Sequence, residues 1–166
     1  MPDPTSRPHG TAREIAVPQD MRTLSALSRI DYENAIRVEF DGAGDRTAQQ
    51  WFRAILEGAP AELREALVSG WSSVLGLRLG PLDSDRHVLG WPIRHSTPDE
   101  VVLSTSSDDG LHGELVVQRT PDAVLTGSFI RLDTAAVRRK WNEVLYQHTP
   151  AMCQLLDGAV SRVVPA

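Results

Sequence analysis

The feature that most constrains the fold is a long amphipathic segment from Asp133 to about Val163, which follows four strand-like runs. Its inward positions recur every three or four residues, the spacing of one helical face. They are Val137, Trp141, Leu145, His148 and Met152. Pro150 removes one backbone N–H from this helix, so we expect a kink near residues 148–150.

The four runs before this helix are predicted strands at residues 87–95, 100–106, 111–120 and 123–132. Each connection between them is short and holds Pro, Gly or Asp, which favour tight reversals. Short connections make neighbouring strands antiparallel, because a parallel crossover needs a dozen or more residues. We therefore expect a meander whose apolar face is buried by the C-terminal helix.

Two short helices are predicted between this meander and an earlier strand at residues 35–40. Thr47 and Gln50 have the spacing of a capping box at the start of the first helix. Gly58-Ala-Pro60 ends that helix and begins the second, since Pro suits a first helical turn.

The predicted fold class is therefore α+β: a curved antiparallel sheet of five to six strands around a long C-terminal helix, with two short helices between the first and second strands. The sixth strand would come from residues 77–82. Residues 1–20, rich in Pro and polar side chains, are expected to form a flexible tail, and residues 21–166 a single domain.

Composition excludes several classes of partner. A net charge of -5 without a basic stripe argues against nucleic acid, and no apolar run is long enough for membrane insertion. Cys153 is the only cysteine, so neither an intrachain disulfide nor a thiolate zinc site is expected. No phosphate-binding or dinucleotide fingerprint is present, and no cofactor is expected. We expect a cytoplasmic protein, with a homodimer through an open sheet edge as one arrangement.

The order of elements resembles the START-like superfamily, also called the helix-grip or SRPBCC fold, over roughly Asp31 to Val163. Residues 75–81 (Leu-Gly-Leu-Arg-Leu-Gly-Pro), 87–91 (His-Val-Leu-Gly-Trp) and 141–148 are similar to a bacterial branch with a shortened sheet. The resemblance implies a cavity between sheet and helix, which in this superfamily commonly binds an apolar or amphipathic ligand. Only some members are enzymes.

Five residues are candidates for the lining of such a cavity. Trp91, Trp141 and Met152 would supply apolar contact area, while His148 and Arg78 would supply polarity. The ordinary alternative is that the tryptophans only pack in the core and that His148 bonds a neighbouring carbonyl. His148 is also the candidate general acid or base, because an imidazole titrates near neutral pH.

Metal binding and covalent catalysis have no support in the sequence. His87 and His95 would lie about 26 Å apart on one extended strand, at roughly 3.3 Å per residue, so they cannot share an ion. No serine has a recognisable triad context.

The predicted function is binding of a small apolar or amphipathic molecule in the sheet–helix cavity. Two alternatives stay open. One is a cyclase, dehydratase or hydrolase that uses His148, which would need a second titratable group within reach. The other is a non-catalytic interaction module with a filled core.

Overall fold

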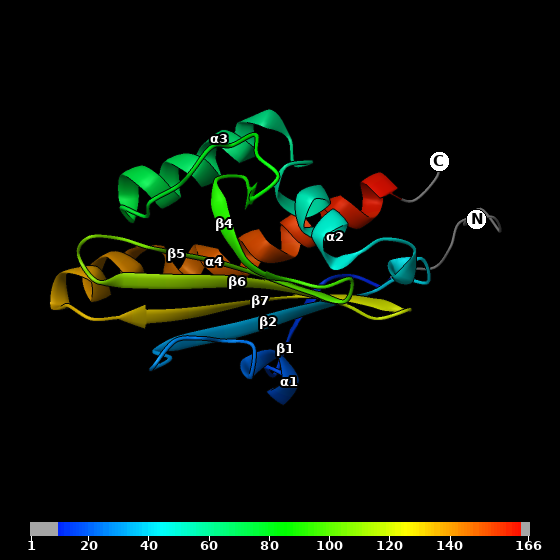
Figure 1. Cartoon of the computed structure of the whole chain (residues 1–166), viewed down its shortest axis with the longest axis horizontal. Helices are drawn as coiled ribbons and strands as arrows, with labels where there is room; N and C mark the ends of the chain where they lie inside the picture. The colour runs from blue at the N-terminus through cyan, green and yellow to red at the C-terminus, as the bar shows by residue number, and fades with distance from the viewer. Residues whose placement is uncertain (1–9, 164–166) are drawn as a thin grey trace.

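The computed structural model describes residues 10–163, and in it seven strands form one open, curved antiparallel sheet (Figure 1). The spatial order is β1-β2-β7-β6-β5-β4-β3. The strands are β1 (Arg13–Ile15), β2 (Tyr32–Glu39), β3 (His87–Val88), β4 (Trp91–Ser96), β5 (Glu100–Ser106), β6 (Leu111–Arg119) and β7 (Ala123–Leu132). The predicted α+β class with an antiparallel sheet is confirmed, and the predicted count of five to six strands is wrong.

Two local features account for the difference in strand count. β1 lies within the expected N-terminal tail and pairs with β2, with Arg13 opposite Arg37; residues 1–9 of that tail lie outside the described residues. The run 87–95 is divided by a reversal at Leu89 and Gly90, whose φ angles of 45° and 87° both lie in the left-handed region.

The reversal also changes the geometry of the two histidines. His87 on β3 lies opposite Pro92 on β4, so His87 and His95 are not on one extended strand, and the separation predicted for them does not apply. The possible sixth strand at residues 77–82 reduces to one isolated bridge between Leu77 and Ser107.

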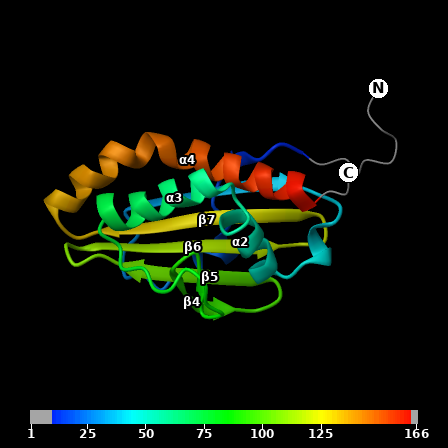
Figure 2. The ribbon, with the colours of Figure 1, turned by 90° about the horizontal axis from the view of Figure 1, so that it is seen from above.

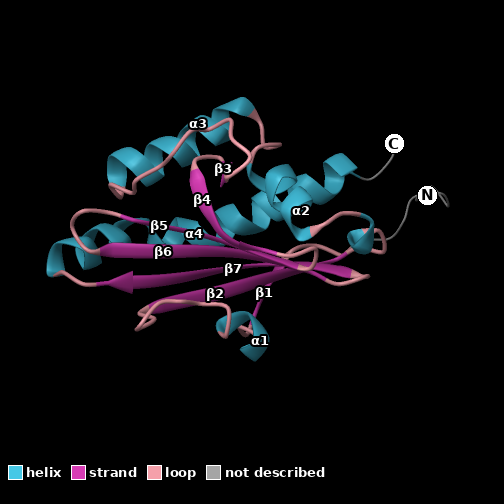
Figure 3. Cartoon of the chain, viewed as in Figure 1, coloured by secondary structure: helices cyan, strands magenta, loops and turns pink. Residues whose placement is uncertain are grey.

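Helices lie on both faces of the sheet (Figures 1 and 3). One face carries α2 (Ala48–Leu56), α3 (Ala61–Ser69), the π-helix η2 (Gly70–Val74) and α4 (Ala135–Val163). The other carries α1 (Gln19–Arg22) and its flanking segment, and the short 3-10 helix η1 (Ala43–Asp45) precedes α2. β7 alternates between the two faces: Val124 and Ile130 belong to the large core beneath α4, whereas Leu125 and Phe129 belong to the smaller core beneath α1.

The long C-terminal helix is confirmed as α4. It follows the length of the sheet and is arched in Figure 2, with Pro150 inside it. Val137, Trp141 and Met152 are buried as the spacing predicts, whereas Leu145 and His148 are half-buried. The kink expected near residues 148–150 stays a prediction.

The two short helices differ in how they pack. The capping box of α2 is confirmed, since the Thr47 hydroxyl accepts from Gln50 N–H and the Gln50 side chain accepts from Thr47 N–H. α2 buries Trp51, Phe52 and three aliphatic side chains, and it contacts the sheet and α4. α3 buries no residue completely and continues directly into η2. It runs beside α4 above the sheet (Figure 2), as a cover rather than as part of the core.

Within residues 10–163, no helix combines the length and apolar character needed to cross a bilayer.

Candidate functional site

A cavity of about 250 Å³ lies between the sheet, α4 and the α3–η2 segment. The sheet contributes Trp91, Leu115 and Ile130 to its wall, and α3–η2 contributes Trp71. None of the described residues that line it is Asp, Glu, Lys or Arg. The wall is thus apolar and aromatic, with polar groups from only a few side chains.

The structure brings three of the five predicted residues together at this cavity, namely Trp91, Trp141 and His148. Met152 is buried on the same helix but lies outside the lining. Arg78 lies away from the cavity; its exposed side chain contacts Asp108 at 3.1 Å. Its neighbour Leu77 is the residue that turns inward, so the guanidinium faces water.

Trp91 occupies a space that a glycine makes available. It stands at the start of β4, where its ring meets Trp71 edge to face at 5.6 Å between centroids. Gly113 on β6 lies beneath it, and a Cβ there would approach the Trp91 ring to 3.2 Å. A larger residue at position 113 would therefore displace this wall of the cavity.

Two buried donors in the wall have no acceptor. The indole N–H groups of Trp91 and Trp141 are closed off from solvent and have no hydrogen-bond partner among the residues that the structure describes. Trp51, away from the cavity, shows the usual arrangement, because its indole N–H donates to the Ala43 carbonyl at 2.8 Å. Buried polar groups are normally paired; Arg64 Nε and Thr126 Oγ1, away from this wall, are also buried without a partner among the described residues.

His148 belongs to a three-ring cluster with Trp141 and Tyr32. The ring centroids are 5.4 Å apart for His148 and Trp141, 5.8 Å for His148 and Tyr32, and 5.1 Å for Tyr32 and Trp141. His148 Nε2 lies 3.0 Å from the hydroxyl of buried Ser128. Burial lowers the pKa of His148 from 6.5 to about 4, so the ring is neutral at pH 7.

A polar seam joins α4 to the sheet at this point. Asn34 and Ser128 are direct cross-strand partners on β2 and β7. Asn34 donates to the Thr149 hydroxyl at 3.1 Å, next to the His148–Ser128 bond. Sequence reasoning missed Tyr32, Asn34 and Ser128. The one feature that could have identified them is a polar group at a strand position that faces the core. Recognising that feature requires the pairing register of β2 and β7.

Two larger hollows, of about 870 and 880 Å³, lie on the surface and are lined largely by charged and loop residues. One of the two arginines in each hollow is engaged by the fold. Arg119 bonds Asp99 and two carbonyls, and Arg53 bonds Glu57 and the carbonyls of Ser84, Asp85 and His87. Ligand sites are typically apolar with a few polar groups, so we place the site in the smaller, apolar cavity.

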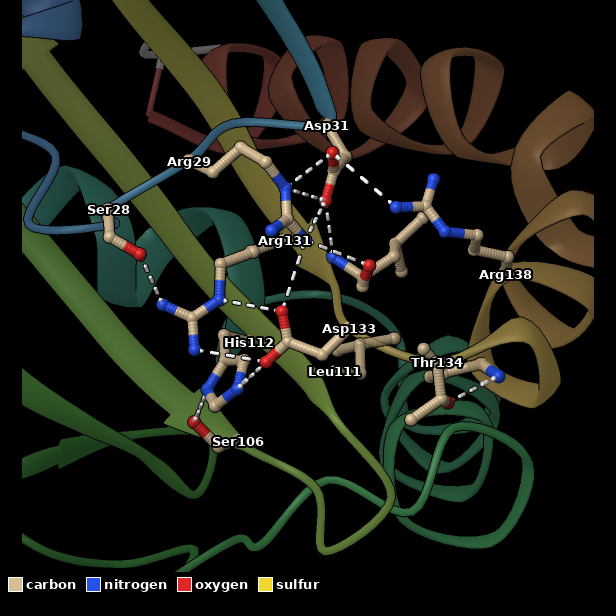
Figure 4. Close-up of polar contacts among 12 residues, drawn as sticks. Ser28, Arg29, Asp31, Ser106, Leu111, His112, Arg131, Asp133, Thr134 and Arg138 are labelled. Atoms are coloured by element: carbon tan, nitrogen blue, oxygen red, sulfur yellow. Dashed lines mark hydrogen bonds and ion pairs between the residues drawn. The ribbon is translucent and has the colours of Figure 1, made fainter.

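A charged cluster stands at the junction of β7 and α4 (Figure 4). The carboxylate of Asp133 lies 3.0 Å from a guanidinium nitrogen of Arg131, 3.1 Å from one of Arg29 and 3.0 Å from His112 Nε2. Hydrogen bonding, chiefly from Arg131, lowers the pKa of Asp133. In the same cluster, Arg29 and the Leu132 N–H lower the pKa of Asp31 to about 2.

Within this cluster, Ser106, His112 and Asp133 form a hydrogen-bonded chain, with 2.8 Å between the Ser106 hydroxyl and His112 Nδ1. Its composition is that of a serine nucleophile, a base and an orienting acid. Ser106 and His112 are, however, ordinary cross-strand partners, and neither lines any of the cavities described above. The cluster ties the loop before β2 to the start of α4.

Among residues 10–163, no group of three or more His, Cys, Asp or Glu side chains is arranged to hold a metal ion. Neither a family model nor a curated protein matches this chain.

Proposed function

We propose that the chain is a START-like, helix-grip domain that binds a small apolar or amphipathic molecule in the cavity between its sheet and α4. The observation that carries this proposal is the aromatic, uncharged cavity of about 250 Å³ to which Trp91, Trp141 and His148 all contribute. Ligand sites are typically apolar with a few placed polar groups.

The size of the cavity limits the ligand. An apolar cavity of roughly 150 Å³ binds benzene, and pockets for drug-sized ligands begin near roughly 300 Å³. A volume of about 250 Å³ fits a molecule of one or two rings. Larger lipids would require α3 and η2 to move away from the sheet.

Binding is better supported than acid–base catalysis on the same scaffold. The enzyme alternative needs a second titratable group within reach of His148, and no carboxylate is among the described lining residues. With its pKa lowered to about 4, His148 is a weak base at neutral pH. The unfilled volume argues against the interaction module with a filled core.

Filling the cavity tests the proposal. Ala151 lies on α4 in the lining, and Ala136 lies on the same helix in an exposed position outside it. Titration calorimetry with acetophenone and isopropylbenzene should show saturable binding of at least one probe to wild type and to Ala136→Phe. Ala151→Phe should bind at least about tenfold more weakly, because the added ring occupies the cavity.

The proposal fails if neither probe binds the wild-type protein, or if Ala151→Phe binds as tightly as Ala136→Phe. Native mass spectrometry of the purified protein adds a direct observation, since a retained small molecule would identify the natural ligand class. We also expect His148→Ala to weaken probe binding more than it lowers stability.

A further inference from the structure

We infer that the surface hollow of about 870 Å³ beside α1 is a second binding site, and that its ligand is a small zwitterion. The ligand carries a carboxylate, which binds at Arg37, and an ammonium group, which binds at Glu100, joined by a short apolar chain. This hollow shares none of its described lining residues with the apolar cavity beneath α4, so zwitterion binding goes beyond the proposed function.

A row of four side chains that crosses the sheet forms the floor of the hollow. Arg37 on β2 lies opposite Leu125 on β7. Gln118 on β6 lies between Leu125 and Glu100 on β5. Directly opposed residues point to the same face of a sheet, and Leu125 belongs to the core beneath α1, so all four face α1 and line the hollow. The floor therefore runs from a cation, past an apolar side chain and an amide, to an anion.

Gln118 is a buried polar side chain that stays open to the hollow. It is 9% exposed, and its amide makes no hydrogen bond with any residue between 10 and 163. Unlike the indole nitrogens of Trp91 and Trp141, both atoms of this amide keep contact with solvent, on the face of the sheet that lines the hollow. An amide has donors and an acceptor, so it can bond either charged group of a zwitterion.

Arg37 is the cation of the hollow that the fold leaves unpaired. Arg119 is held by Asp99 and two carbonyls, whereas Arg37 makes no ion pair or side-chain hydrogen bond within the described part of the chain. The cross-strand partner of Arg37 is Arg13, which also has no ion pair with a described residue. Like charges directly opposite each other destabilise a sheet. A carboxylate bound at Arg37 offsets this repulsion.

Glu100 is the anion at the other end of the floor. One of its carboxylate oxygens lies 3.3 Å from His95 Nε2, and the second oxygen has no partner among the described side chains. Over the whole described lining, carboxylates outnumber guanidinium groups by five to two. This excess repels a simple anion, while unpaired Arg37 repels a simple cation. A zwitterion meets an opposite charge at each end.

The spacing of the strands sets the length of the ligand. Three strand spacings of about 4.8 Å place the Cα atoms of Arg37 and Glu100 about 14 Å apart. The charged groups of 6-aminohexanoate lie about 7 Å apart, which is the length of two extended residues. The arginine and glutamate side chains are long enough to cover the remaining distance, and Leu125 lies beneath the apolar chain.

Three six-carbon probes differ only in their end groups. They are 6-aminohexanoate, a zwitterion, 1,6-diaminohexane, a dication, and adipate, a dianion. At low ionic strength and neutral pH, 6-aminohexanoate should bind at least about fivefold more tightly than either of the others, because each of those places a like charge at one end of the floor. Titration followed by nitrogen-15 NMR gives the affinities.

The side-chain amide of Gln118 reports the contact directly. Its resonances, assigned by their loss in Gln118→Met, should shift as 6-aminohexanoate is added. The side-chain amide of Gln147, which lines the apolar cavity, is the internal control and should not shift.

A charge reversal tests the direction of binding. Arg37→Glu should change the ranking, so that 1,6-diaminohexane binds more tightly than 6-aminohexanoate. Arg78→Glu is the matched control, because it makes the same change of net charge at an exposed arginine outside the hollow. This control should keep the wild-type ranking.

Each outcome supports or overturns zwitterion binding. If 1,6-diaminohexane binds wild type as tightly as 6-aminohexanoate, the hollow is only an acidic surface; if adipate does, Arg37 alone attracts it. Either result overturns the inference, as does a lack of saturable 6-aminohexanoate binding or an unchanged ranking in Arg37→Glu. If that variant does not fold, the wild-type ranking and the Gln118 resonances decide. Binding of uncharged probes in the apolar cavity is unaffected by all of these outcomes.

Discussion

Replacing His148 by Gln tests whether this ring is held neutral beneath α4. In the native protein its pKa is lowered from 6.5 to about 4 by burial, with Ser128 as its hydrogen-bond partner. In the unfolded chain the imidazole titrates near its ordinary pKa of about 6.5. Between these two values the unfolded state binds a proton that the native state does not bind. The free energy of unfolding therefore falls as the pH falls through this window.

The size of the effect follows from the two pKa values. Linkage predicts that His148 accounts for a loss of about 2 kcal/mol between about pH 7.5 and about pH 5, and about 3 kcal/mol by about pH 4. His148→Gln removes the titrating group. The free energy of unfolding of this variant should therefore fall less than that of the wild type over the same pH range, by the amount assigned to His148. The other titrating groups are common to both proteins and cancel in the difference.

Urea unfolding followed by tryptophan fluorescence measures both curves. His148→Phe is the second variant, because it keeps an aromatic ring against Tyr32 and Trp141 while removing the titration. Both variants should show a flatter pH dependence than wild type above about pH 4, whatever their constant offset in stability. Parallel curves for wild type and both variants would refute a buried, neutral His148.

Further predictions concern the fold around the site. Gly127→Ala should lower the free energy of unfolding by about 1–3 kcal/mol, because the added methyl would overlap the sulfur of buried Met21. Gly70 has open space around it and a helical φ, so Gly70→Ala should raise the free energy of unfolding by about 0.5–1 kcal/mol. Urea unfolding measures both changes. The pKa of Asp31 is lowered to about 2, so its contribution to the free energy of unfolding is present above about pH 4 and is lost as the pH falls toward 2. Asp31→Asn should remove this acid-sensitive contribution. Acid titration followed by circular dichroism measures the difference. Thr47→Ala should cost about 1 kcal/mol in thermal unfolding through loss of the capping box.

Local patterns were enough to predict most of the fold. Helical spacing identified the buried face at Val137, Trp141 and Met152, and short polar connections identified the antiparallel meander. The strand count could not be read in the same way. β1 has only three residues and owes its place to pairing with β2. The reversal at residues 89–90 needs a positive φ in Leu89 as well as in Gly90, and a leucine rarely adopts one, so Gly90 alone did not identify a turn in the run 87–95.

Residues of the candidate site were predictable where the periodicity of a helix or strand shows which of its side chains face the core. Periodicity brought Trp141 and His148 to the cavity, and Trp91 followed from its strand. Arg78 failed as a candidate because it lies in an irregular loop, where no period says which way a side chain points. The partners of the site, Ser128 and Tyr32, come from strands distant in sequence, so only the register of β2 and β7 reveals them.

Several departures from ordinary packing in this protein lie at the cavity. Interiors are packed nearly without voids, buried donors are nearly always paired, and π-helices are rare and frequently lie at functional sites. Here an unfilled volume is bordered by the π-helix η2 and by the two tryptophans whose indole N–H groups have no partner among the described residues, and the α3 that covers it buries no residue completely. Each departure costs stability, and α2 on the same face of the sheet shows that this fold can pack tightly. Arg64 Nε and Thr126 Oγ1 are also buried without partners in the described chain, away from the cavity, but the cavity combines unpaired donors with an unfilled apolar volume. The proposed ligand would fill that volume and stabilise the fold by binding.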